Sequence, residues 1–375
     1  MRGALLIGLG LLLHGCHNAP PLRAAPAPAE GWEGFYPPAR VTDAWLRQRG
    51  IPLDAAAVRQ VVPRVVKLVL AGGSKQAPEP ELVKMHERYC AAPAVRAWNR
   101  KRCAALEARR CAGGQCTYEH FGNCSGLLVG GGRLLTAAHC VAELAEDAAL
   151  ARASEVLAPG EGGAPTRTLR LGKIALGKRD FSHEWVAVRE PGAVDAALAT
   201  VEDSGLEPWP RAPLPERGAV IFMVGYPRAE RRTAATRKAL SYELVFGTPA
   251  VTFGRVMEPN RAGRPFCSVD GNQEHWALAG DCPVARGAAG QRGPITRGAF
   301  LTSADTTNGL SGAPVLDEKG RLIGVNVTVA GGIDPQERYG SQAVGVSAAA
   351  VARALGRWDL RPCSGTGASS CRRSP

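Results

Sequence analysis

One histidine of the chain stands in surroundings that suit acid–base chemistry. His139 ends the run Thr-Ala-Ala-His and is followed directly by Cys140. An imidazole titrates near neutral pH, so it can take a proton from a weak nucleophile and return it to a leaving group. The small residues Ala137 and Ala138 leave room for the ring in a cleft of close-packed backbone. A lone histidine is usually an ordinary surface or core residue, so the neighbouring residues decide the interpretation.

A candidate nucleophile lies in a glycine-rich segment further along the chain. Ser311 stands within Gly309-Leu-Ser-Gly-Ala-Pro314, ahead of an apolar run that predicts a strand. The nucleophile elbow of α/β-hydrolases has Gly-x-Ser-x-Gly between a strand and a helix. The spacing here and the strand–loop–strand context disagree with that alternative. The simpler alternative is an ordinary serine in a glycine-rich turn.

Both segments resemble motifs of the chymotrypsin-like serine proteases. The run from Cys124 through an apolar strand to Thr-Ala-Ala-His139-Cys140 resembles the family's histidine motif, and Gly309-x-Ser-Gly-x-Pro resembles its serine motif. The resemblance implies that His139 is the general base and Ser311 the nucleophile. Gly309 lets the backbone turn so that its own N–H group and that of Ser311 converge as an oxyanion hole.

The third member of the implied catalytic triad is a carboxylate between these two motifs, because the family order is His, Asp, Ser. Asp195 heads Asp-Ala-Ala-Leu, which resembles the family's Asp-x-Ala-Leu motif, and lies 56 positions after His139. A carboxylate there orients the imidazole and stabilises its cation. Asp180 and Asp203 are the competing candidates, but no apolar run follows either directly.

Within the family, Gly-x-Ser-Gly-Ala-Pro-Val most resembles the bacterial glutamyl-endopeptidase-like secreted proteases. Asn326 stands where that subgroup has a histidine that goes with preference for glutamate, so this preference is not supported. Leu310 stands where the trypsin branch has an aspartate that pairs with a freed N-terminus. Asp305, six positions before Ser311, is either a pocket-floor carboxylate for Lys or Arg or a turn-forming aspartate.

The charge of the chain invites a nucleic-acid hypothesis. The formal net charge is +12 and the sequence pI is about 9.4. The arginines are scattered, with short clusters such as Arg228–Arg232, and there is no zinc-finger spacing, no RNP-type aromatic motif and no long basic arm. We therefore predict no nucleic-acid partner, and we assign neither a metal nor a cofactor.

The N-terminus predicts export. Arg2 precedes the apolar stretch Ala4–Leu13, which is too short to cross a bilayer but suits a signal peptide. The following Cys16 resembles the lipidated cysteine of bacterial lipoproteins, although His14 replaces a small residue. His17 after the cysteine favours the outer membrane. A plain signal peptide and a secreted protein are the alternative.

In an exported protein, the cysteines are expected to form disulfides. Ten cysteines remain besides Cys16, an even number in an oxidising compartment. The family resemblance implies a Cys124–Cys140 disulfide that holds the histidine loop. Four other cysteines fall in or just after the helix-favouring stretch 80–110, at Cys90, Cys103, Cys111 and Cys116.

These patterns predict an all-β fold of two packed antiparallel β-barrels, with a helical, disulfide-braced insertion and a short C-terminal helix. The predicted organisation is a signal peptide (1–15), an Ala/Pro-rich tether (16–55), a protease domain (56–360) containing the insertion (72–120), and a tail (361–375). A first strand is expected over 64–71, two helices broken near Pro93, and N-caps at Asp54 and Ser347.

The predicted function is that of a secreted serine endopeptidase that cleaves protein or peptide substrates through an acyl-enzyme on Ser311. We also expect a lipid anchor to hold the protein in a bacterial membrane. The alternative from another class is a catalytically latent surface protein that uses the protease fold for binding. Leu310 and the insertion at 72–120 keep that alternative open.

Overall fold

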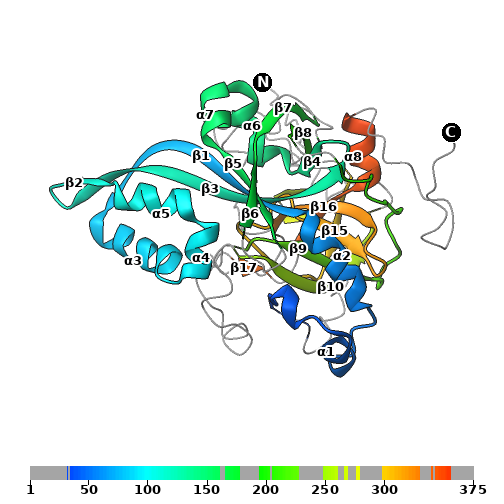
Figure 1. Cartoon of the computed structure of the whole chain (residues 1–375). Coiled ribbons are helices and arrows are strands. Elements are labelled where there is room, and N and C mark those ends of the chain that lie inside the picture. The colour runs from blue at the N-terminus through cyan, green and yellow to red at the C-terminus, as the bar shows by residue number, and fades with distance from the viewer. Residues whose placement is uncertain are drawn as a thin grey trace, which may run out of the picture.

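Two β-sheet units make up most of the chain that the computed structural model describes (Figure 1). The described residues are 32, 34–160, 165–177, 194–202, 205–227, 248–260, 266–268, 276–278, 298–329, 339–340 and 343–355. Both units are antiparallel and are built from consecutive parts of the chain. The predicted all-β class with two packed β units is confirmed.

The second unit is a closed barrel of six strands in the order β10-β13-β18-β16-β15-β9. All six residues of β9 are buried, as expected for a continuous apolar run in a core. The strands are β9 (Val220–Gly225), β10 (Ala250–Glu258), β13 (Ala299–Thr302), β15 (Pro314–Asp317), β16 (Leu322–Val329) and β18 (Ala343–Ser347). The short strands β11 (Phe266–Ser268), β12 (Trp276–Leu278), β14 (Thr306–Thr307) and β17 (Tyr339–Gly340) form two further pairs.

The first unit is a curled sheet in the order β6-β5-β1-β3-β4-β8-β7, with β2 added beside β3. Only Arg170 separates β6 from β7 along the chain, although these strands stand at opposite ends of the order. The sheet must therefore curl until its two ends are neighbours. Its strands are β1 (Val65–Pro78), β2 (Arg110–Ala112), β3 (Gln115–Gly130), β4 (Arg133–Thr136), β5 (Glu155–Pro159), β6 (Pro165–Leu169), β7 (Leu171–Leu176) and β8 (Ala197–Val201).

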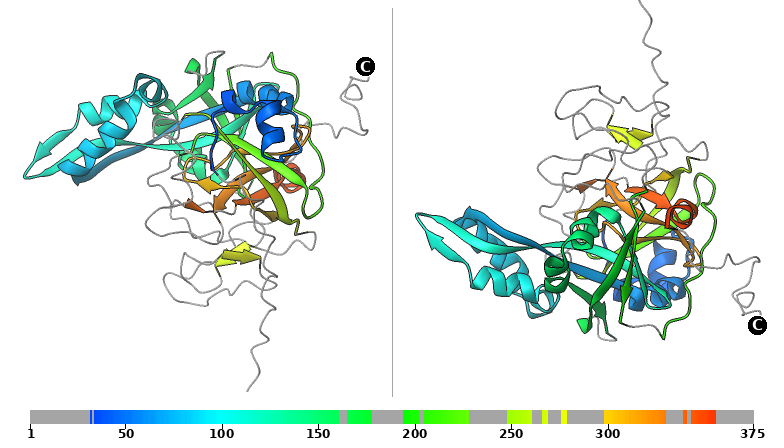
Figure 2. Two further views of the ribbon diagram at one scale, coloured as in Figure 1. Left: turned by 90° about the horizontal axis from the view of Figure 1, so that it is seen from below. Right: turned by 90° about the horizontal axis from the view of Figure 1, so that it is seen from above.

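The predicted insertion is a helical arm on a long ribbon. Strands β1 and β3 continue past the curled sheet, with α3 (Glu79–Cys90), α4 (Pro93–Trp98) and α5 (Arg100–Glu107) beside them. Figure 2 shows this arm projecting from the body in both views. Disulfides Cys90–Cys103 and Cys111–Cys116 brace it around a small separate core. Three helices form where two were expected, because Asn99 interrupts the stretch after Pro93.

The remaining helices are short, and the two N-caps expected from the sequence, at Asp54 and Ser347, are present. Asp54 accepts a hydrogen bond from Ala56 N at 2.7 Å, and Ser347 Oγ accepts one from Ala350 N at 3.3 Å. The helices are η1 (Pro38–Arg40), α1 (Asp43–Gln48), α2 (Ala55–Val61), η2 (Val62–Arg64), α6 (Ala138–Glu146), α7 (Ala148–Ala153) and α8 (Ala348–Leu355). The last of these is the predicted C-terminal helix.

The tether predicted for residues 16–55 needs a correction at its C-terminal end. Tyr36 pairs with Val251 of β10 through two backbone hydrogen bonds of 2.8 Å, and Val41, Leu46 and Ile51 are buried in the main core. Residues 34–55 are therefore packed rather than extended. The prediction followed the Pro- and Ala-rich composition of the preceding residues. The apolar side chains of residues 34–55 bury enough surface to order this segment.

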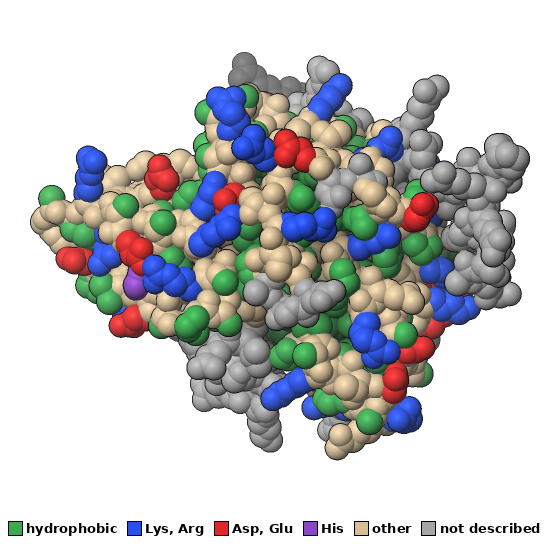
Figure 3. Space-filling model, in the orientation of Figure 1, with side chains coloured by type: hydrophobic (Ala, Val, Ile, Leu, Met, Phe, Trp, Pro, Cys, Tyr) green, Lys and Arg blue, Asp and Glu red, His purple; other side chains and the backbone are tan. Residues whose placement is uncertain are grey.

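Two surface features bear on the predicted partners. Lys and Arg side chains are spread over the face shown in Figure 3 rather than gathered in one patch. Among the described helices, none combines the length and the hydropathy needed to cross a bilayer.

Candidate active site

The loop that presents His139 is fixed from both sides. Strand β4 ends at Thr136, and helix α6 begins at Ala138, so His139 lies in the first turn of that helix. A disulfide joins Cys140 to Cys124 of β3, with the sulfurs bonded and the Cα atoms 6.3 Å apart. Ala137 and Ala138 are fully buried, which places backbone close behind the ring. The imidazole thus projects from a rigid corner.

Asp195 holds His139 at two points. Its Oδ2 lies 2.8 Å from His139 Nδ1, and its Oδ1 accepts a hydrogen bond of 3.0 Å from the backbone N–H of His139. Asp195 is only 3% exposed and stands just ahead of β8, which pairs with β4. The carboxylate therefore fixes both the ring and the tautomer that places a proton on Nδ1. Asp180 and Asp203, the competing candidates, lie outside the described residues.

The environment of the imidazole changes its pKa in two opposite directions. Burial lowers the pKa of His139, whereas the negative charge of Asp195 and the hydrogen bond to it raise that pKa. The net result is a pKa above the ordinary value of 6.5. The ring is therefore a stronger base than a free histidine, which suits proton abstraction from a hydroxyl.

Ser311 lies next to this pair. Its carbonyl accepts a hydrogen bond of 2.8 Å from Ser125 N of β3 and lies 3.9 Å from Cys140 Sγ, which in turn lies 3.7 Å from His139 Nε2. The Ser311 hydroxyl makes a long hydrogen bond of 3.5 Å to Val327 O. Among the described residues, no hydrogen bond joins this hydroxyl to His139. Such contacts are often loose without substrate and tighten when it binds.

The backbone around Ser311 has a pattern of bonded and unbonded N–H groups. The N–H groups of Leu310, Gly312 and Ala313 donate to Thr307 O, Asn326 O and Leu310 O, at 3.1, 2.7 and 2.9 Å. Within the described part of the chain, the N–H groups of Gly309 and Ser311 have no acceptor. Gly309 has φ +93°, a conformation that favours glycine. Both predicted oxyanion donors are thus available, whereas the N–H groups of Leu310, Gly312 and Ala313 are bonded.

The two residues predicted for the specificity pocket are both buried but contact different parts of the chain. Asp305 is 3% exposed, and its carboxylate accepts a hydrogen bond from the backbone N–H of Gly34, in the N-terminal segment. Asn326 is 1% exposed, and its Nδ2 donates to Leu310 O at 2.9 Å and to Thr306 Oγ1 at 3.2 Å. Asn326 therefore contacts the loop of the nucleophile itself.

Sequence reasoning missed Ser125, the residue after Cys124. Its backbone N–H bonds Ser311 O, and its hydroxyl donates to Gly309 O at 2.7 Å. Both contacts join the first β unit to the nucleophile loop, 184 to 186 positions away in the chain. The only sequence signal was a position beside a motif cysteine.

Two groups of possible metal ligands occur in the described chain, and both contain oxidised sulfur. They are Cys124, His139 and Cys140, and Glu79, Cys111 and Cys116. The cysteines of each group are joined in a disulfide, so they offer no thiolate to a metal ion.

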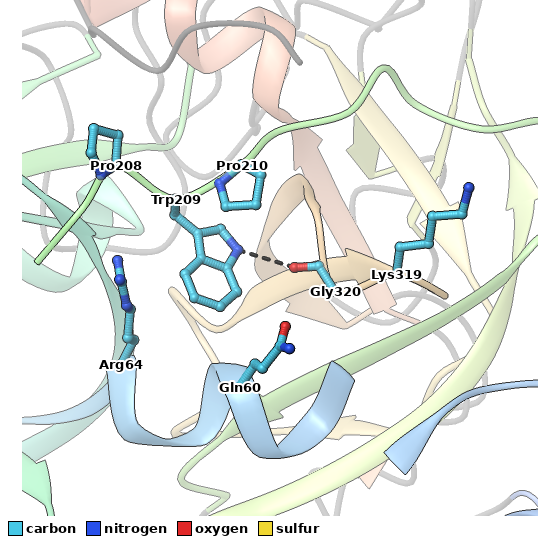
Figure 4. A pocket seen from close by; sticks show the side chains of 7 residues that line it. All are labelled: Gln60, Arg64, Pro208, Trp209, Pro210, Lys319 and Gly320. Atoms are coloured by element: carbon cyan, nitrogen blue, oxygen red, sulfur yellow. Dashed lines mark hydrogen bonds between the residues drawn. The ribbon is translucent and has the colours of Figure 1, made fainter. Parts of the chain in front are cut away.

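A shallow pocket of about 300 Å³ lies apart from the residues of the predicted triad. Figure 4 shows Trp209 at its centre, with its indole N–H donating to Gly320 O at 3.1 Å. Arg64 stacks over the Trp209 ring at 5.0 Å from its centroid. The pocket contains no acid–base pair of the kind that His139 and Asp195 form.

Comparison with known proteins identifies the fold family. The sequence profile of the trypsin-like peptidase domain matches residues 124–325, more than half of the chain. That span contains His139, Asp195 and Ser311. No curated protein sequence matches the chain.

Two of the solved structures that match the chain have low sequence identity to it. The Rv3671c protease from M. tuberculosis in its active form is 19% identical, with a TM-score of 0.41 and coverage of 83% of this chain and 87% of that chain. The HtrA-type protease AlgW with a decapeptide is 16% identical, with a TM-score of 0.41 and coverage of 80% and 66%. The family assignment rests on the sequence profile. The chain belongs to the trypsin-like peptidase family.

Proposed function

We propose that the protein is a serine endopeptidase that uses Ser311 as nucleophile, His139 as general base and Asp195 as the group that orients it. The observation that carries this proposal is the pair of available N–H groups at Gly309 and Ser311 beside the His139–Asp195 hydrogen bond. A protein that used the fold only for binding would have no need to leave these two donors available while bonding the N–H groups of Leu310, Gly312 and Ala313.

The proposed reaction proceeds in two halves. Ser311 Oγ bonds to the scissile carbonyl carbon while its proton moves to His139 Nε2, and the carbonyl oxygen becomes negative between the N–H groups of Gly309 and Ser311. The C–N bond then breaks, and Nε2 gives its proton to the leaving amine. Water attacks the resulting ester with its proton passing to Nε2, and Ser311 leaves with that proton.

We propose neither of the two specificities that the motifs suggested. The imidazole that goes with glutamate preference in the resembling subgroup is replaced by Asn326. The carboxylate of Asp305, which could select Lys or Arg, is buried and bonded to Gly34 N. A buried, bonded carboxylate is a poor partner for an incoming cation, because the existing contact must break first.

We also propose that the protein is exported and acts in the bacterial cell envelope, anchored by a lipid at Cys16. His17, the residue after this cysteine, favours the outer membrane as the site of anchoring. The support is the signal-like segment and the three disulfides of the described chain. Disulfides form and persist in oxidising compartments. The latent alternative receives little support, since all three triad side chains are present.

The test is covalent labelling of the purified mature protein with a fluorophosphonate probe, read by intact mass. We expect one probe per molecule in the wild type and none in Ser311→Ala or His139→Ala. Ser154→Ala is the matched control: this buried hydroxyl bridges Ala71 N and Leu150 O within the first unit, so labelling should persist. An unlabelled but folded wild type would contradict the proposal and favour the latent alternative.

A further inference from the structure

Two successive carbonyl groups of the nucleophile loop are held by buried side chains from different β units. Ser125 Oγ, on β3 of the curled sheet, donates to Gly309 O at 2.7 Å. Asn326 Nδ2, on β16 of the closed barrel, donates to Leu310 O at 2.9 Å. Ser125 is 0% and Asn326 1% exposed, so water does not compete for these contacts.

The contact of Asn326 bears directly on an oxyanion donor. The peptide that joins Leu310 to Ser311 contains both Leu310 O and Ser311 N–H. In a planar trans peptide these two groups point in opposite directions. Holding Leu310 O toward Asn326 therefore aims the Ser311 N–H the other way. A hydrogen bond to the carbonyl also polarises the peptide and strengthens its N–H as a donor.

The contact of Ser125 limits the freedom of Gly309. Glycine populates many backbone conformations, and the φ of +93° at Gly309 is one among them. The Ser125 hydroxyl accepts from Tyr226 N at 2.9 Å, so its own proton is left to donate to Gly309 O. The backbone of Ser125 is fixed as well, with its N–H on Ser311 O and its carbonyl on Thr136 Oγ1 at 2.7 Å. One rigid residue thus selects one conformation of the loop.

We propose that Ser125 and Asn326 are positioning residues that hold the oxyanion hole in its working shape. This inference rests on the proposed peptidase function. It gives Asn326 a role in transition-state stabilisation in place of substrate selection. It also explains how the two β units, which contribute His139 and Ser311 separately, keep the loop in register.

The test compares Ser125→Ala, Ser125→Thr and Asn326→Asp with the wild type and with Ser154→Ala. Asn326→Asp keeps the shape but replaces the Nδ2 donor with an oxygen. Ser154 has the same donor–acceptor pattern as Ser125, between Ala71 N and Leu150 O, without contact to the loop. Cleavage of a peptide amide is measured per active site, after titration with the fluorophosphonate, and a peptide aldehyde serves as a transition-state analogue.

We expect kcat per titrated site to fall about tenfold to a hundredfold in Ser125→Ala and Asn326→Asp, less than the loss of an oxyanion donor itself causes. KM should change little, and aldehyde affinity should fall in step with kcat, because only the transition state uses the oxyanion hole. Ser125→Thr, which keeps a hydroxyl, should recover most of the loss, and Ser154→Ala should match the wild type.

Three results separate the possible failures. An active wild type with unchanged kcat per titrated site in both Ser125→Ala and Asn326→Asp would overturn the positioning role alone. Wild-type protein that is folded but neither titrates nor cleaves would overturn the proposed function and this inference with it. If Asn326→Asp raises KM and leaves kcat unchanged, Asn326 acts in substrate selection, and its positioning role is overturned.

Discussion

The two carboxylate oxygens of Asp195 contact different parts of His139, one the ring and the other the backbone. Oδ2 bonds Nδ1, and Oδ1 bonds the N–H of the same residue, so ring and main chain move together. Because charge and hydrogen bonding outweigh burial, the pKa of His139 is raised above 6.5. The protonated ring is favoured in the folded state. Its contribution to stability is full below 6.5 and is lost as the pH rises through the raised pKa.

Replacing Asp195 by Asn should separate orientation from basicity. An amide can keep a bond to Nδ1 but favours the wrong tautomer and carries no charge, so kcat should fall by roughly 10⁴-fold. In the wild type, kcat/KM should rise with pH through a midpoint above 6.5, as the imidazole loses its proton. In Asp195→Asn the midpoint should move to lower pH, because burial then dominates. Equal midpoints in the two pH–rate profiles would contradict this account.

Gly312 is required by close packing as well as by its backbone conformation. Its φ is +84°, and an added Cβ would lie 2.1 Å from Ser125 O and 2.2 Å from Thr136 Oγ1. Gly312→Ala should therefore cost about 3 kcal/mol or more in unfolding free energy, measured by urea denaturation. Gly131 is the matched control, with φ +61° and no atom within 4 Å of an added Cβ. Gly131→Ala should cost only about 1 kcal/mol of strain, and equal losses would refute the packing argument.

At the scale of elements, the helical arm is attached to the body at a few buried points. Lys67 of β1 is fully buried, and its Nζ donates to Trp98 O at 2.6 Å and to Asn99 Oδ1 at 2.7 Å. The Trp98 ring packs on Tyr226 at a centroid distance of 4.9 Å. Tyr226 N donates to Ser125 Oγ, so the arm reaches the supports of the nucleophile loop through one intervening residue.

Lys67→Met should change how stability depends on pH. Burial, and then the charge of Arg102, hold the pKa of Lys67 well below 10.5 in the folded protein. As the pH falls through 10.5 the unfolded chain takes up a proton that folded Lys67 does not, so the contribution of Lys67 to wild-type stability should decrease as the pH falls below 10.5. The variant should show a shallower slope in the pH range just below 10.5, by up to about 1.4 kcal/mol per pH unit. Parallel urea-unfolding curves across this range would show that the lysine is not desolvated.

At the scale of the whole molecule, the N-terminal segment completes the core. The largest hydrophobic cluster contains residues of this segment, of the curled sheet and of the closed barrel together. Tyr36 packs against Trp45 at 4.7 Å and Phe253 at 6.1 Å between ring centroids, and it is 2% exposed. Asp305, close to Ser311 in the chain, is bonded to the same segment through Gly34. Folding of residues 34–55 and of the protease body should therefore be a single transition.

Tyr36→Ala should destabilise the entire protein. Loss of a buried aromatic side chain costs about 3–5 kcal/mol, through lost burial and the cavity left behind. Urea unfolding followed by Trp fluorescence should show one transition at lower denaturant. Val83→Ala on the arm is the control, since that side chain is 39% exposed and should cost little. If Tyr36→Ala unfolds at the same urea concentration as the wild type, residues 34–55 are a tether and do not contribute to the core.

Much of the candidate site could be predicted from the sequence because its chemistry depends on short local patterns. A histidine between small residues and a cysteine, an Asp ahead of an apolar strand, and a serine between glycines each lie within a few positions. The caps at Asp54 and Ser347 are equally local, and the structure has both. Such patterns constrain the backbone directly, so no knowledge of distant residues was needed.

Only the tertiary structure decided the contacts between residues far apart in the chain. It paired Cys90 with Cys103 and Cys111 with Cys116, and it packed residues 34–55 into the core. It also brought Ser125 onto Gly309 across 184 positions, and Gly34 onto Asp305 across 271. Each of these depends on how strands curl and pair, which balances burial of many side chains against chain entropy. No local pattern encodes that balance, so the residues that position the site become visible only in the folded molecule.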